Sequence, residues 1–244
     1  MSGEFPDDTL VKPGTGMFKV SASERVVFMP AGATATMAAV RFLARKKGRG
    51  PYPARIYRLK RNGFPIDIVG GAMGAPVAAM ALENLIAGGA KKIILAGVAG
   101  SLDPALKIGD LMVVNEAICD EGTSKDYFPE QNPPAASESL TAKLESELKR
   151  RGQAYSVGKA FTTDAFYRET RQKLARFRAL GARVVEMELS AMFTIARFRK
   201  VEFASAVAIS DEHSDTEWKS GFTSPSFFLN LLRVVDVSLD ALTQ

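Results

Sequence analysis

Two short stretches of the chain place acidic side chains beside apolar ones in a way that suits chemistry on a bound ligand. The first is Glu186, Met187 and Glu188, which lie in the otherwise apolar segment RVVEMELSAMFTIAR at residues 183–197. Because an unpaired buried charge is costly, carboxylates in such a segment need partners. On the residues alone, Glu188 is interpreted as a paired structural carboxylate.

The second stretch is ISDEH at residues 209–213, where Ser210, Asp211 and His213 come directly after an apolar run. A carboxylate at the carboxyl end of a buried strand is well placed for acid/base work, because partial desolvation raises its pKa toward neutrality. Its alternative role is to cap whatever element follows. His213 and Cys119 are the only residues of their types, so we expect no histidine-built or cysteine-built metal site.

The elements that must position these residues alternate along the chain, since apolar runs of strand length are interleaved with segments of helical period. This alternation predicts an α/β fold around a central sheet. Asn-Gly in RNGFP (61–65) predicts a tight hairpin, which makes the sheet mixed. The predicted strands are 25–30, 54–60, 65–70, 92–100, 111–118, 154–161, 183–189 and 203–210, and the predicted helices are 35–47, 76–89, 137–151, 168–180, 188–199 and 225–242.

No linker divides the chain, so we expect an irregular segment at residues 1–20 followed by a single domain at 21–244. The hydrophobic fraction of 46% is that of an ordinary globular protein and excludes a mostly disordered chain. There is no apolar leader and no apolar run long enough to span a bilayer, so we expect a cytoplasmic protein that does not bind membranes. The net charge of +5 comes from basic runs without a nucleic-acid-reading motif, so we expect no nucleic-acid partner.

Two glycine-bearing segments follow predicted strands, GGAMGAP (70–76) and GVAGSL (97–102). Glycines at the carboxyl ends of strands let a phosphate or a sugar approach backbone N–H groups. Neither segment matches a dinucleotide fingerprint or a P-loop, and each is also explained as a plain tight connection. The polar segment at 120–127 is a further candidate for ligand contacts, and its alternative interpretation is a solvated turn.

Six stretches together resemble the nucleoside phosphorylase family, which includes purine nucleoside phosphorylases, uridine phosphorylases and methylthioadenosine nucleosidases. The resemblance covers roughly residues 25–235 and implies a single α/β domain with a mixed, partly barrel-like central sheet flanked by helices. It also implies a homo-oligomer, from dimer to hexamer, in which a neighbouring subunit completes each site. The stretches are GGAMGAPVAAMALENL (70–85), GVAGSLDPALKIGDLMVV (97–114), DEGTSKDYFP (120–129), FTTDAFYRE (161–169), VVEMELSAMF (184–193) and AISDEHSDTEWKSGF (208–222).

The resemblance assigns roles to particular residues. Glu188 matches the glutamate that binds the ribose hydroxyls, Met187 the methionine packed against the sugar, and Glu186 a further acidic position of the same motif. Phe161 matches the aromatic that stacks on the base or the sugar, and we group Phe161 and Ser210 as base-binding residues. Asp211 matches the general acid that serves N7 of a purine. The implied activity is cleavage of the N-ribosyl bond of a purine or uridine-type nucleoside.

The nucleophile side is expected at Gly32, Gly97, Val98 and Gly100. Phosphorylases of the family hold phosphate with arginines, yet MPAGATATM (29–37) contains none and Leu95 stands at the second arginine position. Three readings stay open: phosphorolysis with inorganic phosphate as the co-substrate and no other cofactor, hydrolysis by water, or a catalytically silent nucleoside-binding relative. For the first, Arg49 or Arg55 of a neighbouring subunit is a candidate for remaking the anion site.

Overall fold

A computed structural model describes residues 9–30, 46–48, 54–128, 134–214 and 216–244. Its centre is a mixed sheet of ten strands in the order β10-β9-β6-β7-β8-β5-β1-β4-β3-β2. The strands are β1 (Arg25–Met29), β2 (Lys46–Gly48), β3 (Arg55–Arg61), β4 (Phe64–Gly70), β5 (Lys92–Ser101), β6 (Leu111–Cys119), β7 (Ser156–Thr162), β8 (Ala182–Glu186), β9 (Glu202–His213) and β10 (Trp218–Ser220).

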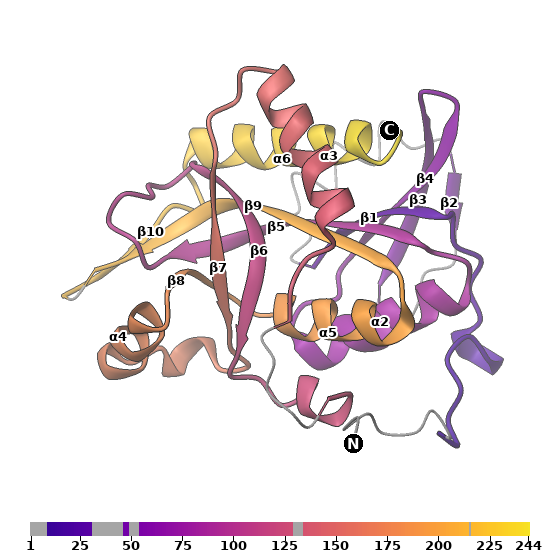
Figure 1. Cartoon of the computed structure of the whole chain (residues 1–244), viewed down its shortest axis with the longest axis horizontal. Coiled ribbons are helices and arrows are strands. Elements are labelled where there is room, and N and C mark those ends of the chain that lie inside the picture. The colour runs from indigo at the N-terminus through magenta and orange to yellow at the C-terminus, as the bar shows by residue number, and fades with distance from the viewer. Residues whose placement is uncertain (1–8, 31–45, 49–53, 129–133, 215) are drawn as a thin grey trace.

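Part of this sheet closes on itself. Strand β5 pairs in parallel with β9 along one edge and antiparallel with β8 at its carboxyl end, so β5, β9, β6, β7 and β8 form a ring. Strands β1, β4, β3 and β2 extend the sheet away from the ring (Figure 1). The predicted mixed sheet with barrel character is confirmed.

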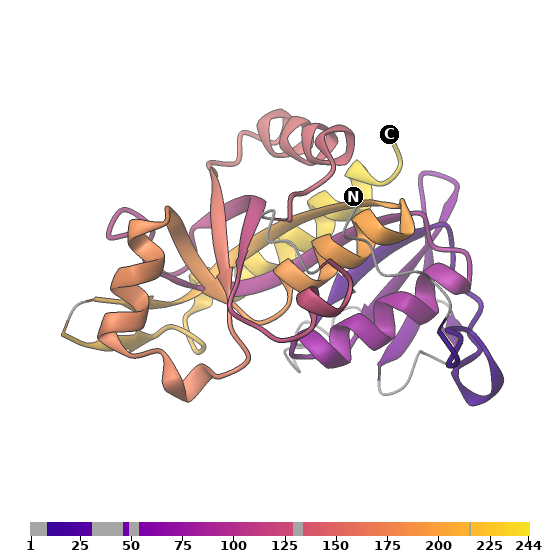
Figure 2. The same cartoon turned by 60° about the horizontal axis from the view of Figure 1, so that its bottom comes forward.

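Helices cover both faces of the sheet. Helices α3 and α6 lie over one face, and α2 and α5 run side by side over the other (Figures 1 and 2). Two apolar cores follow from this layering, one between the sheet and each helix pair. The described helices are α2 (Ala75–Ala87), α3 (Glu138–Arg150), α4 (Arg171–Ala179), α5 (Leu189–Arg199) and α6 (Pro225–Ala241).

The hairpin predicted from Asn-Gly is present between β3 and β4. Asn62 and Gly63 both have positive φ, 49° and 85°, which is what a two-residue turn between twisted strands requires. The turn brings Arg61 opposite Phe64.

Several predicted boundaries were wrong. The predicted helix 35–47 lies mostly outside the described residues, and at 46–48 the chain is strand β2. Helix α4 starts at Arg171 and not at residue 168, because the Thr170 side chain caps it by accepting from the Lys173 backbone N–H. Strand β10 was not predicted, and residues 9–20 contain only a 3-10 helix, η1 (Gly16–Phe18).

One edge of β5 has an opening. Strand β1 pairs with β5 only as far as Leu95, and β8 joins the same edge only at Gly100. Among the described strands, none therefore pairs with this edge over residues 96–99. The carboxyl ends of β1, β4, β5 and β9 point the same way, because these four strands are parallel. Ligands in α/β sheets bind at such an end.

Candidate active site

Glu188 lies two residues beyond the end of β8, the strand that joins β5 at Gly100. Helices α2 and α5 both begin here: Gly74 is the N-cap of α2, Glu188 is the N-cap of α5, and the Gly74 backbone N–H donates to Glu188 Oε1 at 2.5 Å. Burial, together with the neighbouring Glu186, raises the pKa of Glu188 to about 8. A buried carboxyl group placed at two helix N-termini can accept hydroxyl donors, and it accepts them most strongly once it is ionised.

Glu186 has a different environment. Its Oε2 accepts from the backbone N–H groups of Glu188 and Leu189 at 2.6 and 2.7 Å, and Thr162 Oγ1 donates to its Oε1. These bonds hold the start of α5 against β7. Glu186 therefore acts as a side-chain cap of the helix, and its contacts do not favour the ribose-side role that the resemblance implied. Met187, between the two glutamates, is half-buried.

Asp211 lies near the end of β9 with three polar partners. Ser210 Oγ donates to Oδ1 at 2.6 Å, Trp218 Nε1 donates to Oδ2 at 2.8 Å, and His213 Nε2 lies 3.0 Å from Oδ2. Burial acts to raise the pKa of Asp211, but these partners outweigh it and the pKa is lowered. Asp211 is therefore ionised at neutral pH and has no proton of its own to give.

The two residues predicted to contact the base are occupied elsewhere. The Ser210 hydroxyl donates its hydrogen bond to Asp211 Oδ1. Phe161 is fully buried, and its ring stacks on Phe177 of α4 at a centroid distance of 3.8 Å. This is the position of a core aromatic, because the apolar cluster around it leaves no exposed face, and it argues against the base-stacking role predicted for Phe161.

The residues predicted to face the nucleophile are strand residues. Gly97, Val98 and Gly100 lie inside β5, as the predicted strand 92–100 implied, with a register irregularity between Ala99 and Gly100. Leu95 folds over Gly97, since a Cβ at Gly97 would lie 2.6 Å from Leu95 Cδ2. Val98 is half-buried. Gly32 and Arg49 lie outside the described residues.

For the polar segment after β6, the alternative interpretation as a solvated turn was wrong at the centre of the segment. Glu121 is buried and accepts from the hydroxyls of Ser124 and Ser190. Asp120 forms an ion pair with Lys173 of α4. The segment thus ties β6 to α4 and α5.

Sequence reasoning missed the group that surrounds Asp211. Glu169 comes from the turn before α4, and its Oε2 lies 3.3 Å from His213 Nε2. Trp218 of β10 is half-exposed and makes an edge-to-face contact with Phe166, with centroids 6.1 Å apart. The uniqueness of His213 and the lone tryptophan in EWKSGF were visible signals, but nothing in the sequence paired either with Glu169.

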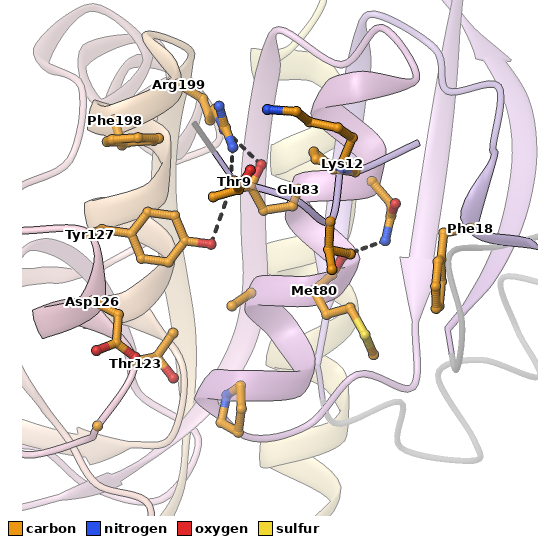
Figure 3. A pocket seen from close by; sticks show the side chains of 16 residues that line it. Thr9, Lys12, Phe18, Met80, Glu83, Thr123, Asp126, Tyr127, Phe198 and Arg199 are labelled. Carbon is orange, nitrogen blue, oxygen red and sulfur yellow. Dashed lines mark hydrogen bonds and ion pairs between the residues drawn. The ribbon is translucent and has the colours of Figure 1, made fainter. Parts of the chain in front are cut away.

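A cavity of about 610 Å³ lies elsewhere, between the N-terminal segment, α2 and α5 (Figure 3). Glu83 is its polar centre and accepts from Tyr127 Oη at 3.0 Å and from Arg199 Nε at 2.8 Å. None of the predicted site residues lines it. Tyr127, Glu83 and Arg199 bond to one another on its wall.

Comparison with known proteins decides the family. The model of the phosphorylase superfamily matches residues 26–232. The chain belongs to this superfamily. It is similar to the uridine phosphorylase of Thermococcus kodakarensis, at 35% identity over 46% of the chain and 41% of that protein. It is also similar to the DeoD-type purine nucleoside phosphorylase of Exiguobacterium sibiricum, at 28% identity over 71% of the chain and 74% of that protein.

The solved structures agree on the fold of this superfamily member. The purine nucleoside phosphorylase of Toxoplasma gondii in complex with immucillin-H matches with a TM-score of 0.83 at 23% identity, covering 98% of this chain and 97% of that one. None of the helices within the described ranges is long and apolar enough to cross a membrane. Nor do those ranges contain a group of three or more histidine, cysteine and acidic residues placed to hold a metal ion.

Proposed function

We propose that this protein cleaves the N-ribosyl bond of a nucleoside by phosphorolysis, giving free base and ribose 1-phosphate. The observation that carries the proposal is Glu188, a buried carboxyl group at the start of α5 that receives a hydrogen bond from Gly74. Cleavage passes through a sugar with oxocarbenium character, so a group that grips the ribose and strengthens its hold in the transition state accelerates it. Glu188 is that group.

Ribose binding is coupled to the charge of Glu188. Burial keeps its carboxyl partly protonated in the free protein, whereas two sugar hydroxyls donating to it favour the carboxylate. Charge-assisted bonds of this kind are about twice as strong as neutral ones. Substrate binding therefore releases a proton from Glu188.

The unpaired edge of β5 over residues 96–99 supports a nucleophile site next to the sugar, because backbone groups there are not used by a neighbouring described strand. Arg55 is exposed, and such a residue supplied by a neighbouring subunit would add the positive charge that phosphate needs. This arrangement requires the homo-oligomer, from dimer to hexamer, that the family resemblance implies. We place the enzyme in the cytoplasm, with phosphate as its only co-substrate.

Hydrolysis is the second candidate, and a specific observation favours it. Leu95 covers Gly97, and Val98 packs against the apolar core, so the wall of the opening is apolar where an anion would lie. Water needs no positive charge there. A catalytically silent nucleoside-binding protein is the third reading.

The test is release of free base from purine nucleosides and uridine, with and without phosphate. Phosphorolysis predicts release that depends on phosphate and is lost in Glu188→Gln. Equal release without phosphate would assign the activity to hydrolysis instead. If calorimetry shows nucleoside binding but no base is released from any nucleoside, the protein is a silent relative.

A further inference from the structure

His213 lies at the centre of a buried cluster that the proposed reaction has not yet used. Its Nε2 is 3.0 Å from Asp211 Oδ2 and 3.3 Å from Glu169 Oε2. Side-chain exposures are 8% for His213, 6% for Glu169 and 4% for Asp211. A histidine within reach of two buried carboxyl groups can exchange a proton with either of them.

The cluster is not a fully satisfied structural network. Among the described residues, His213 Nε2 and Glu169 Oε2 are buried without an aligned hydrogen-bond partner. The distances from His213 Nε2 to Glu169 Oε2 and to Asp211 Oδ2 are short enough for hydrogen bonds, but neither contact has hydrogen-bond angles. Buried polar groups left in this state are uncommon and have an explanation where they persist. A proton that moves between partners is such an explanation.

The surroundings are built for this cluster. A Cβ at Gly100 would lie 2.7 Å from Asp211 Oδ2 and 2.8 Å from His213 Nε2. The absence of a side chain on β5 is therefore what admits both groups. Glu212, between them on β9, faces away and accepts from the Ile108 backbone N–H at 3.1 Å.

The charged and polar groups that face His213 come from four parts of the fold. Strand β9 supplies Asp211, the turn before α4 supplies Glu169, and β10 supplies Trp218 through its bond to Asp211. Helix α4 adds Lys173, whose charge acts on Glu169, and Arg178, whose Nη2 donates to the His213 carbonyl oxygen at 2.7 Å. The nearest residue of β5 is Gly100, which carries no charge.

We propose that His213 is a positioning residue that holds the proton for the leaving base and passes it through Asp211, with Glu169 as the second carboxylate that retains it. This inference rests on the proposed function and narrows its substrate to purine nucleosides, whose N7 accepts a proton. When the C1′–N9 bond breaks, its electron pair stays on the base and the nucleophile bonds to C1′. The proton moves from His213 through Asp211 to the base, and solvent returns a proton to the imidazole.

Ionisation of the cluster supports the assignment. The partners of Asp211 lower its pKa, so it relays a proton better than it stores one. Burial raises the pKa of Glu169 to about 7, against the opposing effect of His213. The two carboxyl groups that flank one imidazole thus differ in their hold on a proton, which is how acid and base roles separate in one site.

The experiment compares guanosine with 7-methylguanosine in the full-length protein. The methylated base already carries a positive charge on its imidazole ring and leaves as a neutral molecule without protonation. His213→Gln should therefore raise the ratio of kcat/KM for 7-methylguanosine to that for guanosine by about tenfold or more. Glu212→Gln, on the same strand but outside the cluster, is the matched control and should leave the ratio as in wild type.

A pH profile separates this role from a structural one. Glu169→Gln should move the alkaline limb of the guanosine profile to lower pH, because one of the two negative charges that retain the proton is gone. A His213→Gln variant that slows both substrates equally overturns the proposal and leaves the proposed function standing. The same holds if the wild-type protein cleaves uridine but cleaves neither guanosine nor 7-methylguanosine. A wild type that cleaves no nucleoside overturns both.

Discussion

Glu186 and Glu188 are two residues apart and equally buried, with 6% exposure each, but their side chains have different partners and different roles. Glu186 is fixed by two backbone N–H groups at the start of α5, whereas Glu188 accepts from the Gly74 backbone N–H at the start of α2. The contrast explains why the sequence motif alone cannot assign roles. Both carboxylates are needed, one to build the site and one to use it.

Glu188 should make the protein less stable as pH rises. Its folded-state pKa of about 8 lies above the ordinary value of 4.5, so the folded protein keeps a proton that the unfolded chain releases. The free energy of unfolding therefore falls as pH rises from about 5 to 8. Glu188→Gln should remove most of this fall.

Urea unfolding across this pH range measures the effect of Glu188. The exposed Glu138→Gln is the control and should keep the wild-type pH dependence. A Glu188→Gln variant with unchanged pH dependence would show that Glu188 is ionised throughout the range.

Phe161 should behave as a core residue. Phe161→Leu and Phe177→Leu each break the same stacked pair, so each should lower the free energy of unfolding by about 1–3 kcal/mol. The KM for a nucleoside should change by less than about threefold in both variants. A large rise in KM confined to Phe161→Leu would restore the base-stacking role.

At the scale of elements, the start of α5 depends on Thr162 of β7. Its hydroxyl donates to Glu186 and also accepts from the Ser190 backbone N–H at 3.0 Å. Thr162→Val keeps the shape and removes both bonds, so we expect a loss of about 1–3 kcal/mol in unfolding free energy. Thr141→Val is the matched control, because the buried Thr141 Oγ1 has no hydrogen-bond partner within the described part of the chain and its removal should be neutral or stabilising.

Denaturant unfolding compares the two threonine variants. Equal losses in Thr162→Val and Thr141→Val would contradict the capping role of Glu186. Hydrogen exchange in the first turn of α5 should increase only in Thr162→Val.

Strand β5 should tolerate no side chain at Gly100. A methyl group there meets Asp211 and His213 within 3 Å, so Gly100→Ala should displace the cluster and reduce kcat/KM by roughly 100-fold. Gly122→Ala is the control, since the nearest atom to its Cβ is Asp164 Oδ2 at 3.8 Å. Steady-state kinetics of the two variants checks this, and a fully active Gly100→Ala would contradict it.

At the scale of the whole molecule, the sequence predicted what depends on nearby residues. The Asn62-Gly63 hairpin and most strands and helices follow from local conformation and periodicity, and the family resemblance supplied the barrel-like sheet. Which residues share a site was harder to predict from the sequence, because these residues meet only when β5 pairs with β8 and β9.

Glu169 illustrates the limit. It lies in the basic stretch RETRQKLARFR, which reads as a solvated helix face. Its side chain becomes buried only because the turn before α4 folds against the end of β9. For Phe161 the sequence suggested a functional role where the structure shows a packing role. The motif match placed its ring at the base, whereas in the structure the ring stacks on Phe177 of α4.

The central claim is that Glu188 grips the ribose, and the most direct test pairs a change in the enzyme with a change in the substrate. We would measure kcat/KM for a ribonucleoside and for the same nucleoside lacking its 2′ and 3′ hydroxyls, in wild type and in Glu188→Gln. Wild type should prefer the ribonucleoside by roughly 100-fold or more, and Glu188→Gln should abolish most of that preference. A preference that survives intact in Glu188→Gln would contradict the claim.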